Sequence, residues 1–535
     1  MNYPGFFTHR ERKSNLQLWS FLILILLPLL LATGCGKKSA ADGSLPRSTP
    51  DAEGFSAQAI LDFIDAAEAS GEELHSFMIL RHGKVLSEGF WAPYRPELKN
   101  TLYSVSKSFT STAIGFAVNE GLLTVNDKVI SFFPEDLPDS ISPNLADMEI
   151  RDLLCMSAGQ QPEPTYSMLA TDNWVKSFLA QPVPNVPGTV FLYNSAATYM
   201  LSAIISKVTG ENVLDYLTPR LFEPLGIEGM DWETDPKGIC TGGWGLRIKT
   251  EDMAKFGQLY LQKGQWNGKQ VVPEAWVDEA TSLKIMQHPD MSEEDRSTSD
   301  WEQGYCYKFW RSRHNSYRAD GAYGQFILIL PEYDAVIIMT AEAKDLQKEL
   351  NLAWDYLLPG FKDGPVSNDQ EVLARLEEKI KKLSVKIPQN EAGADFNKLI
   401  DGHTYAFIPE GEGEPQSYAF LFGENKCYMT KTTSAGKSIP YTYGSGSWTD
   451  GENVSYGPRL LAQPGADTSV SVSFAVAGAY SWSADTTLTL ALRYIESPHT
   501  EYQLFHFSGQ KVTLEKWNSR TGRDNHTLSE GKLAE

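Results

Sequence analysis

Cysteine and positive charge are both scarce in this chain. Its 535 residues include five cysteines, none of which forms a Cys-x-x-Cys pair or has a histidine at metal-ligand spacing, so a metal site is not indicated. The 47 Lys and Arg residues are outnumbered by 68 Asp and Glu, which gives a formal net charge of -21. Because proteins that bind nucleic acid usually present a basic surface, this balance argues against a nucleic-acid partner.

A phosphate-binding loop and a membrane-length apolar run are lacking as well. The stretch Gly436-Lys437-Ser438 has no glycine five residues before Gly436, which a phosphate loop would require, and we expect no cofactor. The apolar run at residues 21 to 31 is interrupted by Pro28 and is shorter than the roughly 20 residues that span a bilayer. Hydrophobic residues make up 42% and charged residues 21%, which is typical of a folded globular protein.

The N-terminal segment has the features of a targeting sequence. Three basic residues precede the apolar run, and small residues and then Cys35 follow it, so we interpret residues 1 to 34 as a signal peptide. A retained anchor helix is the alternative. The sequence Leu-Ala-Thr-Gly-Cys ending at Cys35 resembles a bacterial lipobox. This resemblance implies lipidation of Cys35, a bilayer partner and a location in the bacterial cell envelope, facing the periplasm or the exterior.

Four further cysteines could pair with one another outside the cytoplasm. They permit up to two disulfides in three possible pairings, and four buried free thiols are the alternative. These residues are Cys155, Cys240, Cys306 and Cys427.

The length and the change of pattern along the chain predict at least two folded domains. After a Ser-, Gly- and Pro-rich tether at residues 35 to 54, residues 55 to 362 contain an early hairpin, a helical middle and a late apolar hairpin followed by a helix. We therefore predict an α/β (α+β) domain with an inserted all-helical subdomain. Residues 363 to 394 form an amphipathic helix and linker, and residues 395 to 535 form an all-β domain, a sandwich or a barrel.

A Ser-x-x-Lys motif at Ser104 supplies a candidate nucleophile and base. On a helix, residues i and i+3 share a face, so Lys107 can lie beside Ser104 and accept its proton if burial depresses the lysine pKa. The same motif recurs at Ser434 and Ser529, but neither opens a long apolar-faced helix. Helical context therefore singles out Ser104.

The sequence around Ser104 resembles the class C β-lactamase family of penicillin-recognising serine hydrolases. The run Tyr-Ser-Val-Ser-Lys-Ser-Phe-Thr-Ser is followed in order by three further landmarks, over about residues 55 to 360. The first is Ile-Arg-Asp-Leu-Leu-Cys-Met-Ser-Ala-Gly, which begins at Ile150. The second is Pro-Gly-Thr, which begins at Pro187 and leads to Tyr193, and the third is Gly-Gly-Trp-Gly-Leu, which begins at Gly242. The resemblance implies a penicillin-binding-protein-like fold and acyl-enzyme chemistry on an ester, amide or peptide.

The family's second motif, Tyr-x-Asn, maps onto Tyr193, Asn194 and Ser195. Tyr193 would join Lys107 in handling the proton, because a phenol near an ammonium ionises more readily. Ser195 stands where the family has an asparagine, so Asn194 and Ser195 are the candidate contacts to the substrate.

The third motif departs further from the family. In the stretch Ala319-Asp320-Gly321-Ala322, Ala319 replaces the cation that would grip a substrate carboxylate. The residues Arg311, Arg313, His314 and Arg318 are possible substitutes for that cation.

Other positions near this motif are predicted to build the rest of the site. By resemblance, the backbone amides of Ser104 and Ala322 form an oxyanion hole, and Gly321 permits close backbone approach. Asp320 and Gly321 are candidate substrate contacts, and Trp244 is a candidate for the pocket wall together with Trp301, Trp310 and Tyr323. The acidic stretch of residues 291 to 300 is expected to be a mobile surface loop.

These residues favour a serine hydrolase of the esterase, amidase or peptidase type, acting on a small-molecule substrate. Hydrolysis of β-lactams is not favoured, because Ala319 and Ser195 weaken recognition of an amide that carries a carboxylate. The alternative hypothesis is a ligand sensor or envelope binding protein that is acylated without turnover.

Overall fold

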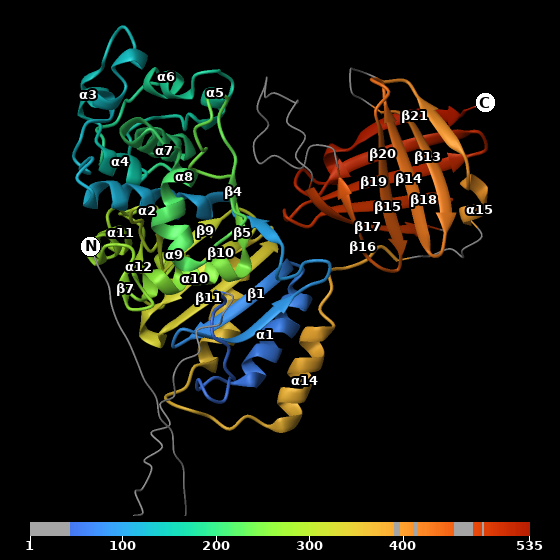
Figure 1. The fold of residues 1–535 in the computed structure, drawn as a ribbon, viewed down its shortest axis with the longest axis horizontal. Coiled ribbons are helices and arrows are strands. Elements are labelled where there is room, and N and C mark those ends of the chain that lie inside the picture. The colour runs from blue at the N-terminus through green and yellow to red at the C-terminus, as the bar shows by residue number, and fades with distance from the viewer. Residues whose placement is uncertain (1–42, 390–395, 410–414, 454–473, 484–485, 535) are drawn as a thin grey trace, which may run out of the picture.

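The computed structural model describes residues 43–389, 396–409, 415–453, 474–483 and 486–534 (Figure 1). The signal peptide and Cys35 lie outside these residues, so cleavage, lipidation and envelope location stay predictions. Among the described residues, no helix combines the length and the apolar character needed to cross a membrane.

A six-stranded antiparallel sheet organises the first domain, in the order β2-β1-β11-β10-β9-β8. The strand β1, from the start of the domain, pairs with β11, from its end, so one sheet joins segments about 260 residues apart in sequence. The bounds are β1 Glu73–Arg81, β2 Lys84–Phe90, β8 Trp310–Ser312, β9 Ser316–Gly321, β10 Gln325–Leu330 and β11 Ala335–Glu342.

The two faces of this sheet bury different cores, because successive strand side chains point to opposite sides. On β1, Phe77 and Ile79 pack with helices from the beginning and the end of the first domain. Met78 and Leu80 face the helical insertion instead. The first group of helices comprises α1 (Ala57–Ser70), α13 (Leu346–Leu352) and α14 (Gln370–Lys381), and α10 (Thr250–Leu261) packs on the other face. Figure 1 shows these helices on the two sides of the sheet.

The insertion between β2 and β8 carries most of the helices of the first domain, joined by irregular stretches and a few short strands. It lies over one end of the sheet, at the top left of Figure 1. Its helices are α2 (Ser106–Asn119), α3 (Pro143–Asp147), α4 (Ile150–Leu154), α5 (Thr165–Leu169), α6 (Trp174–Leu179), α7 (Ser195–Thr209), α8 (Val213–Leu217) and α9 (Glu223–Leu225), with α11 (Glu274–Thr281) and α12 (Glu293–Arg296) further along. A small sheet of β3 (Lys99–Thr101), β5 (Leu246–Lys249) and β4 (Asp231–Trp232) and the hairpin β6 (Gln265–Trp266) and β7 (Lys269–Gln270) complete it.

The C-terminal domain is a closed barrel. Its ten strands follow the order β15-β14-β13-β12-β21-β20-β19-β18-β17-β16, and a parallel pairing of β15 with β17 closes the sheet. The strands are β12 (Thr404–Phe407), β13 (Pro415–Gly423), β14 (Lys426–Thr433), β15 (Ser438–Ser445), β16 (Thr449–Asn453), β17 (Phe474–Trp482), β18 (Thr487–Tyr494), β19 (Thr500–Ser508), β20 (Lys511–Asn518) and β21 (Thr527–Leu533), and the short helix α15 (Asn397–Ile400) precedes them.

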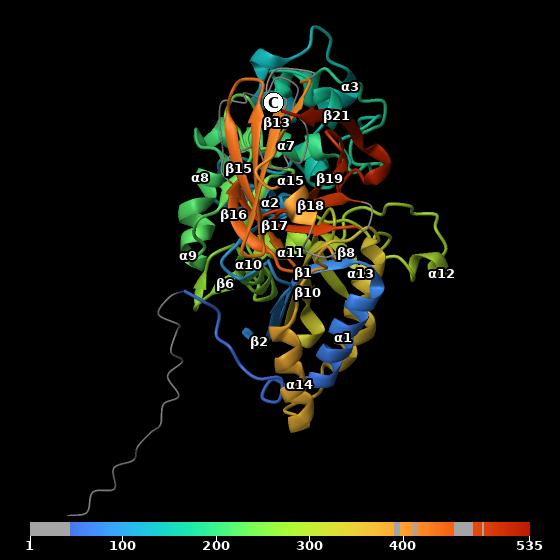
Figure 2. The ribbon, with the colours of Figure 1, turned by 90° about the vertical axis from the view of Figure 1, so that its right-hand side faces the viewer.

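The barrel has its own core but also packs firmly on the first domain. Its interior is rich in aromatic and aliphatic side chains, including Tyr418, Phe505 and Trp482. At the boundary, the buried Arg493 donates from Nη1 to Glu73 Oε1 at 2.6 Å. Figure 2 shows the barrel in front of the first domain when the molecule is turned by 90°.

The predicted fold class is confirmed, with the late hairpin formed by β10 and β11 and the amphipathic helix observed as α14. Between a sandwich and a barrel, the structure decides for a barrel. The four cysteines of the described residues are free thiols, so the disulfide alternative is not realised.

Candidate active site

Ser104 lies in the 3-10 turn Tyr103–Val105 that leads directly into α2. One helical turn later, Lys107 is 1% exposed, and its Nζ lies 2.9 Å from Ser104 Oγ. The structure therefore brings the predicted nucleophile and base within hydrogen-bond distance.

The Lys107 amine is shielded from water, and this disfavours its charged form. Burial lowers the pKa of Lys107 to about 7, while the nearby carboxylates of Glu163 and Asp320 oppose this effect. An amine with such a pKa is substantially neutral at physiological pH and can accept a proton.

The glycine-rich stretch at Gly242 positions this lysine from the opposite side. Lys107 Nζ donates to the carbonyl oxygen of Gly243 at 2.6 Å, and Thr110, one turn further along α2, donates to the Gly242 carbonyl at 2.8 Å. A side chain on Gly243 would place a Cβ 3.0 Å from the Ser195 carbonyl oxygen and 3.6 Å from Lys107 Nζ. The loop can pass this close to α7 and to the lysine because the residue is glycine.

Tyr193 lies beside Lys107 and shares a hydrogen bond with Ser104. Its ring centroid is 5.0 Å from Lys107 Nζ, so the amine sits over the face of the ring. Burial raises the pKa of Tyr193 above its ordinary value, although a hydrogen bond with Ser104 opposes the rise. The phenol is therefore neutral near pH 7, and the expectation that the ammonium would ionise it is not supported by this geometry.

The two residues after Tyr193 start helix α7. Asn194 is the N-cap: its Oδ1 accepts from the Ala197 amide at 2.8 Å, and its Nδ2 donates to Gln160 Oε1 at 2.8 Å. The buried amide side chain thus has partners within the protein at both ends, and its contact with substrate stays a prediction. Ser195 is half-buried and its Cβ lies close to Gly243, at the edge of the lysine site.

The end of β9 closes the site on the other side of Ser104. A Cβ on Gly321 would lie 2.4 Å from the Leu102 carbonyl oxygen and 3.3 Å from Val105 Cγ2. Only glycine lets this strand end lie against the turn that carries Ser104. The oxyanion hole formed by the amides of Ser104 and Ala322 stays a prediction.

Comparison with known proteins agrees with this geometry. The family model described as Beta-lactamase matches residues 70–359, which is more than half of the chain. The chain belongs to the β-lactamase family.

The family's curated relatives are distant in sequence. A 6-aminohexanoate-dimer hydrolase of Paenarthrobacter ureafaciens is 25% identical over 299 residues, covering 50% of this chain and 73% of that protein. A β-lactamase of Yersinia enterocolitica is 26% identical over 191 residues, covering 31% of this chain and 48% of that protein.

Solved structures of low sequence identity also match. The hydrolase EstCE1, described as having promiscuous acyltransferase activity, has a TM-score of 0.46 at 16% identity, with 55% of this chain and 98% of that chain covered. The octameric penicillin-binding protein homologue from Pyrococcus abyssi has a TM-score of 0.45 at 17% identity, with coverages of 89% and 99%.

The third motif of this β-lactamase family member carries an ion pair in place of a free cation. The fully buried Arg318 pairs with Asp320, with Arg318 Nη2 2.9 Å from Asp320 Oδ2. Burial raises the pKa of Asp320, and the charge of Arg318 opposes the rise. Arg318 also donates to the Asp300 carbonyl and to Ser312 Oγ, so its guanidinium is held within the protein, and the charge of Asp320 raises the pKa of Lys107.

The other candidate substitutes for the missing cation also have partners in the protein. Arg313 Nη2 lies 2.9 Å from Asp300 Oδ2, Arg311 donates to Asn315 at 2.9 Å, and the His314 ring packs on Trp354 at 5.1 Å between centroids. The expectation that one of these groups grips a substrate carboxylate is therefore not supported.

A pocket of about 320 Å³ opens beside Tyr193. Trp301 and Trp310 line it as expected from the sequence, together with Phe191, Leu192, Gln287, His288 and Glu302. Trp244, in contrast, is 4% exposed and packs in the helical core, 6.0 Å from the Trp174 ring. A direct contact of Trp244 with substrate stays a prediction.

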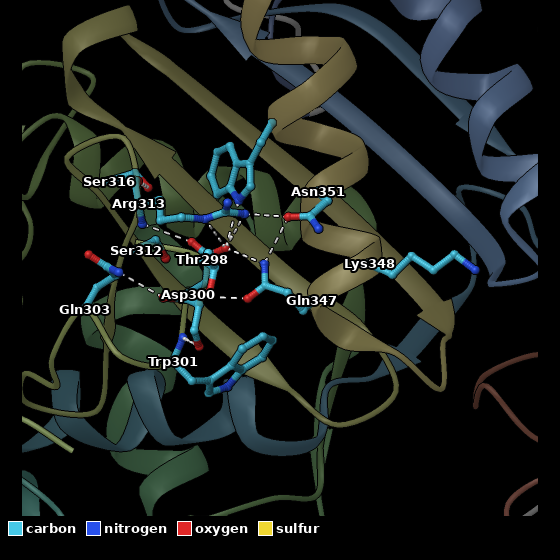
Figure 3. Close-up of polar contacts among 12 residues, drawn as sticks. Thr298, Asp300, Trp301, Gln303, Ser312, Arg313, Ser316, Gln347, Lys348 and Asn351 are labelled. Carbon is cyan, nitrogen blue, oxygen red and sulfur yellow. Dashed lines mark hydrogen bonds and ion pairs between the residues drawn. The ribbon is translucent and has the colours of Figure 1, made fainter. Parts of the chain in front are cut away.

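Asp300 directly precedes the pocket residue Trp301, and Figure 3 shows its polar contacts with Arg313 and Gln347. Its fully buried carboxylate accepts from Arg313 Nε at 3.0 Å, Gln347 Nε2 at 2.7 Å and Trp354 Nε1 at 3.0 Å. Burial alone would raise the pKa of Asp300, but the charge of Arg318 and these hydrogen bonds lower it overall. The stretch expected to be a mobile loop is thus tied down at its last residue, directly before Trp301.

Several residues of the site have no signal in the sequence. Glu163 accepts from the Ser195 amide at 3.0 Å, and its charge raises the pKa of Lys107. Lys308 is a second buried lysine, and its Nζ lies 3.2 Å from Met156 Sδ. Burial and the charge of Lys107 hold the pKa of Lys308 well below its usual range. Neither residue belongs to a motif, because both approach α2 only through the tertiary fold.

We predict that Asp300→Ala destabilises the protein by about 3 kcal/mol, because three donors lose a fully buried charged acceptor. Thermal unfolding of the full chain measures the effect. Glu294→Ala on the exposed helix α12 is the control and is expected to change stability by less than about 0.5 kcal/mol. Equal unfolding temperatures for Asp300→Ala and the control would contradict the anchoring role.

Proposed function

We propose that this β-lactamase family member is a serine hydrolase that forms an acyl-enzyme on Ser104 and acts on neutral ester or amide substrates. The observation that carries this proposal is the contact between Ser104 Oγ and a buried Lys107 amine whose pKa is about 7. Hydroxyl nucleophiles are activated in this way by an adjacent base.

In the acylation step, Lys107 Nζ takes the proton of Ser104 as Oγ forms a bond to the substrate carbonyl carbon. The amides of Ser104 and Ala322 stabilise the negative charge that develops on the carbonyl oxygen. Each donor lowers the activation free energy by roughly 3 kcal/mol. Collapse of this intermediate breaks the bond to the leaving group. The neutral phenol of Tyr193 supplies the proton that the leaving alcohol or amine requires, and the Lys107 ammonium returns a proton to Tyr193.

Deacylation uses the same groups with water as the nucleophile. The neutral Lys107 amine accepts a proton from water, directly or through Tyr193, as the water oxygen attacks the acyl carbon. The bond between Ser104 Oγ and the acyl carbon then breaks, and Oγ takes a proton back from the Lys107 ammonium. The carboxylic acid product is released. The cycle consumes one water and needs no cofactor.

The charges around the site support a neutral substrate. The position of the family's cation is occupied by Ala319, Arg318 is neutralised by Asp320, and Glu163 adds a further carboxylate near Lys107. A carboxylate-bearing substrate would meet negative charge here without a compensating cation. The name of the 6-aminohexanoate-dimer hydrolase relative supports an amide as one substrate class but not a neutral one, because a linear dimer of 6-aminohexanoate keeps a free carboxylate.

We predict that Ser104→Ala abolishes covalent labelling by a fluorophosphonate probe and multiple-turnover hydrolysis of p-nitrophenyl butyrate. Ser529→Ala, which alters an exposed Ser-x-x-Lys motif in β21, is the matched control and is expected to retain both. Equal labelling of Ser104→Ala and wild type would refute the assignment. Labelling of the wild type without turnover would favour the binding-protein alternative instead.

We predict that kcat/KM for a neutral ester rises about tenfold between pH 6 and pH 8, because the fraction of neutral Lys107 increases as pH passes about 7. The Glu163→Gln variant is expected to shift this limb to lower pH, since the Glu163 charge raises the pKa of Lys107. A profile that is flat over this range, or one that rises only above pH 9, would exclude Lys107 as the base.

We predict that neutral esters and amides are hydrolysed with a kcat/KM at least about 100-fold higher than that for penicillins or nitrocefin, given that a charge-assisted pair is worth about 3 kcal/mol. A matched pair of amides, with and without a terminal carboxylate, isolates the charge effect. Preference for the carboxylate-bearing member would show that a cation outside the third motif recognises it.

A further inference from the structure

The C-terminal barrel reaches the active site through the turn between β18 and β19. In this turn, the Glu496 carbonyl accepts from Thr101, through both the amide at 3.1 Å and the hydroxyl at 2.9 Å. The Ser497 carbonyl accepts from the Tyr94 hydroxyl at 3.2 Å, and Ile495 joins the core of the first domain. These contacts fix the turn against the strand that leads to Ser104.

His499, at the end of this turn, is 2% exposed and bridges three residues of the first domain. Its Nε2 is hydrogen-bonded to the Tyr103 hydroxyl, and its Nδ1 lies 2.6 Å from Glu342 Oε1. The Tyr323 ring packs edge-to-face on the imidazole at 4.7 Å between centroids. Tyr103 and Tyr323 also pack on each other at 5.2 Å, so the three rings form one cluster, the His499 cluster.

The two tyrosines of the His499 cluster flank the oxyanion hole in sequence. Tyr103 directly precedes Ser104, and Tyr323 directly follows Ala322. Both have left-handed backbone conformations, with φ of 51° for Tyr103 and 62° for Tyr323. For a residue with a large side chain this conformation costs about 1 kcal/mol or more and persists only where surrounding contacts impose it.

The end of β11 connects these contacts. Glu342 holds His499 and also accepts from Ser519 of the barrel at 2.5 Å, and the next amide, that of Ala343, donates to the Tyr323 carbonyl at 3.0 Å. The imidazole, the carboxylate and the serine thus form a network that crosses the domain boundary twice. The same strand end fixes the backbone after Ala322.

We propose that His499 of the barrel is a positioning residue for the oxyanion hole, and that the C-terminal domain thereby completes the active site of the first domain. His499 touches neither Ser104 nor the substrate. It holds the side chains of Tyr103 and Tyr323, and these hold the backbones that carry the two oxyanion donors. This inference rests on the proposed hydrolase function.

The test compares binding of a transition-state mimic with binding of substrate in the full-length chain. A boronic acid forms a tetrahedral adduct on the serine oxygen and occupies the oxyanion hole, so misplaced donors weaken it more than they weaken substrate. His499→Ala is expected to lower kcat and boronate affinity about 10- to 100-fold, with KM changed less than about threefold. His499→Gln, which can still hydrogen-bond to the Tyr103 hydroxyl, is expected to recover part of the loss.

Two further variants keep the result interpretable. Tyr103→Phe retains the ring and removes only the hydroxyl, and its effect is expected to be non-additive with that of His499→Ala, because both break one contact. If His499→Ala does not fold, Tyr103→Phe alone decides the question. Asp450→Ala is the control, since it removes an exposed ion pair with Arg95 at the same domain boundary, 3.2 Å long, and neither residue belongs to the His499 cluster.

The inference is overturned if kcat and boronate affinity stay within twofold of wild type in His499→Ala or, where that variant does not fold, in Tyr103→Phe. It is equally overturned if boronate and substrate binding weaken by the same factor, which indicates a general structural loss. Labelling of wild-type Ser104 by the fluorophosphonate distinguishes these results from failure of the proposed function, because an unlabelled wild type refutes the hydrolase itself.

Discussion

The removal of the Lys107 amine from water is the constraint on which the rest of the site depends. A lysine at the surface would carry a proton at neutral pH and could not accept one from Ser104. Here the amine is 1% exposed, is held by the Gly243 carbonyl and has a pKa of about 7. The helical insertion and the sheet provide this burial together.

Around this lysine the protein has exchanged the family's cation for negative charge. Asp320 is paired with a buried arginine, Glu163 accepts from the Ser195 amide at the start of α7, and both carboxylates raise the pKa of Lys107. These groups limit how far burial can depress the pKa of Lys107. In the function proposed above, the same few charges therefore act on both the base and the choice of substrate.

The barrel is part of this arrangement rather than an independent appendage. Its own aromatic core makes it a domain, yet Arg493 and the turn at Glu496 are buried against the first domain. Through His499 it contacts the residues next to Ser104 and Ala322. Tyr103 and Tyr323 both have left-handed backbone conformations, which cost free energy. Some of the contacts that hold them in these conformations come from the barrel.

The sequence alone predicted the features that depend on local pattern. Apolar alternation located the hairpin of β10 and β11, and helical periodicity located α14. The spacing of Ser104 and Lys107 on one helical face predicted the contact between these two candidate catalytic side chains. Ordered landmarks supplied the family. Such features are determined within a few residues of chain, so they can be recognised before the fold is known.

Only the tertiary structure decided which long-range partners these residues meet. Arg318 was a candidate cation until its burial against Asp320 became visible, Asn194 until its amide proved to cap α7, and Asp300 was assigned to a mobile loop. His499 lies 395 residues from Ser104 and carries no motif. Burial, charge pairing and contacts between domains depend on the whole chain, because each is set by what packs around a residue and not by its neighbours in sequence.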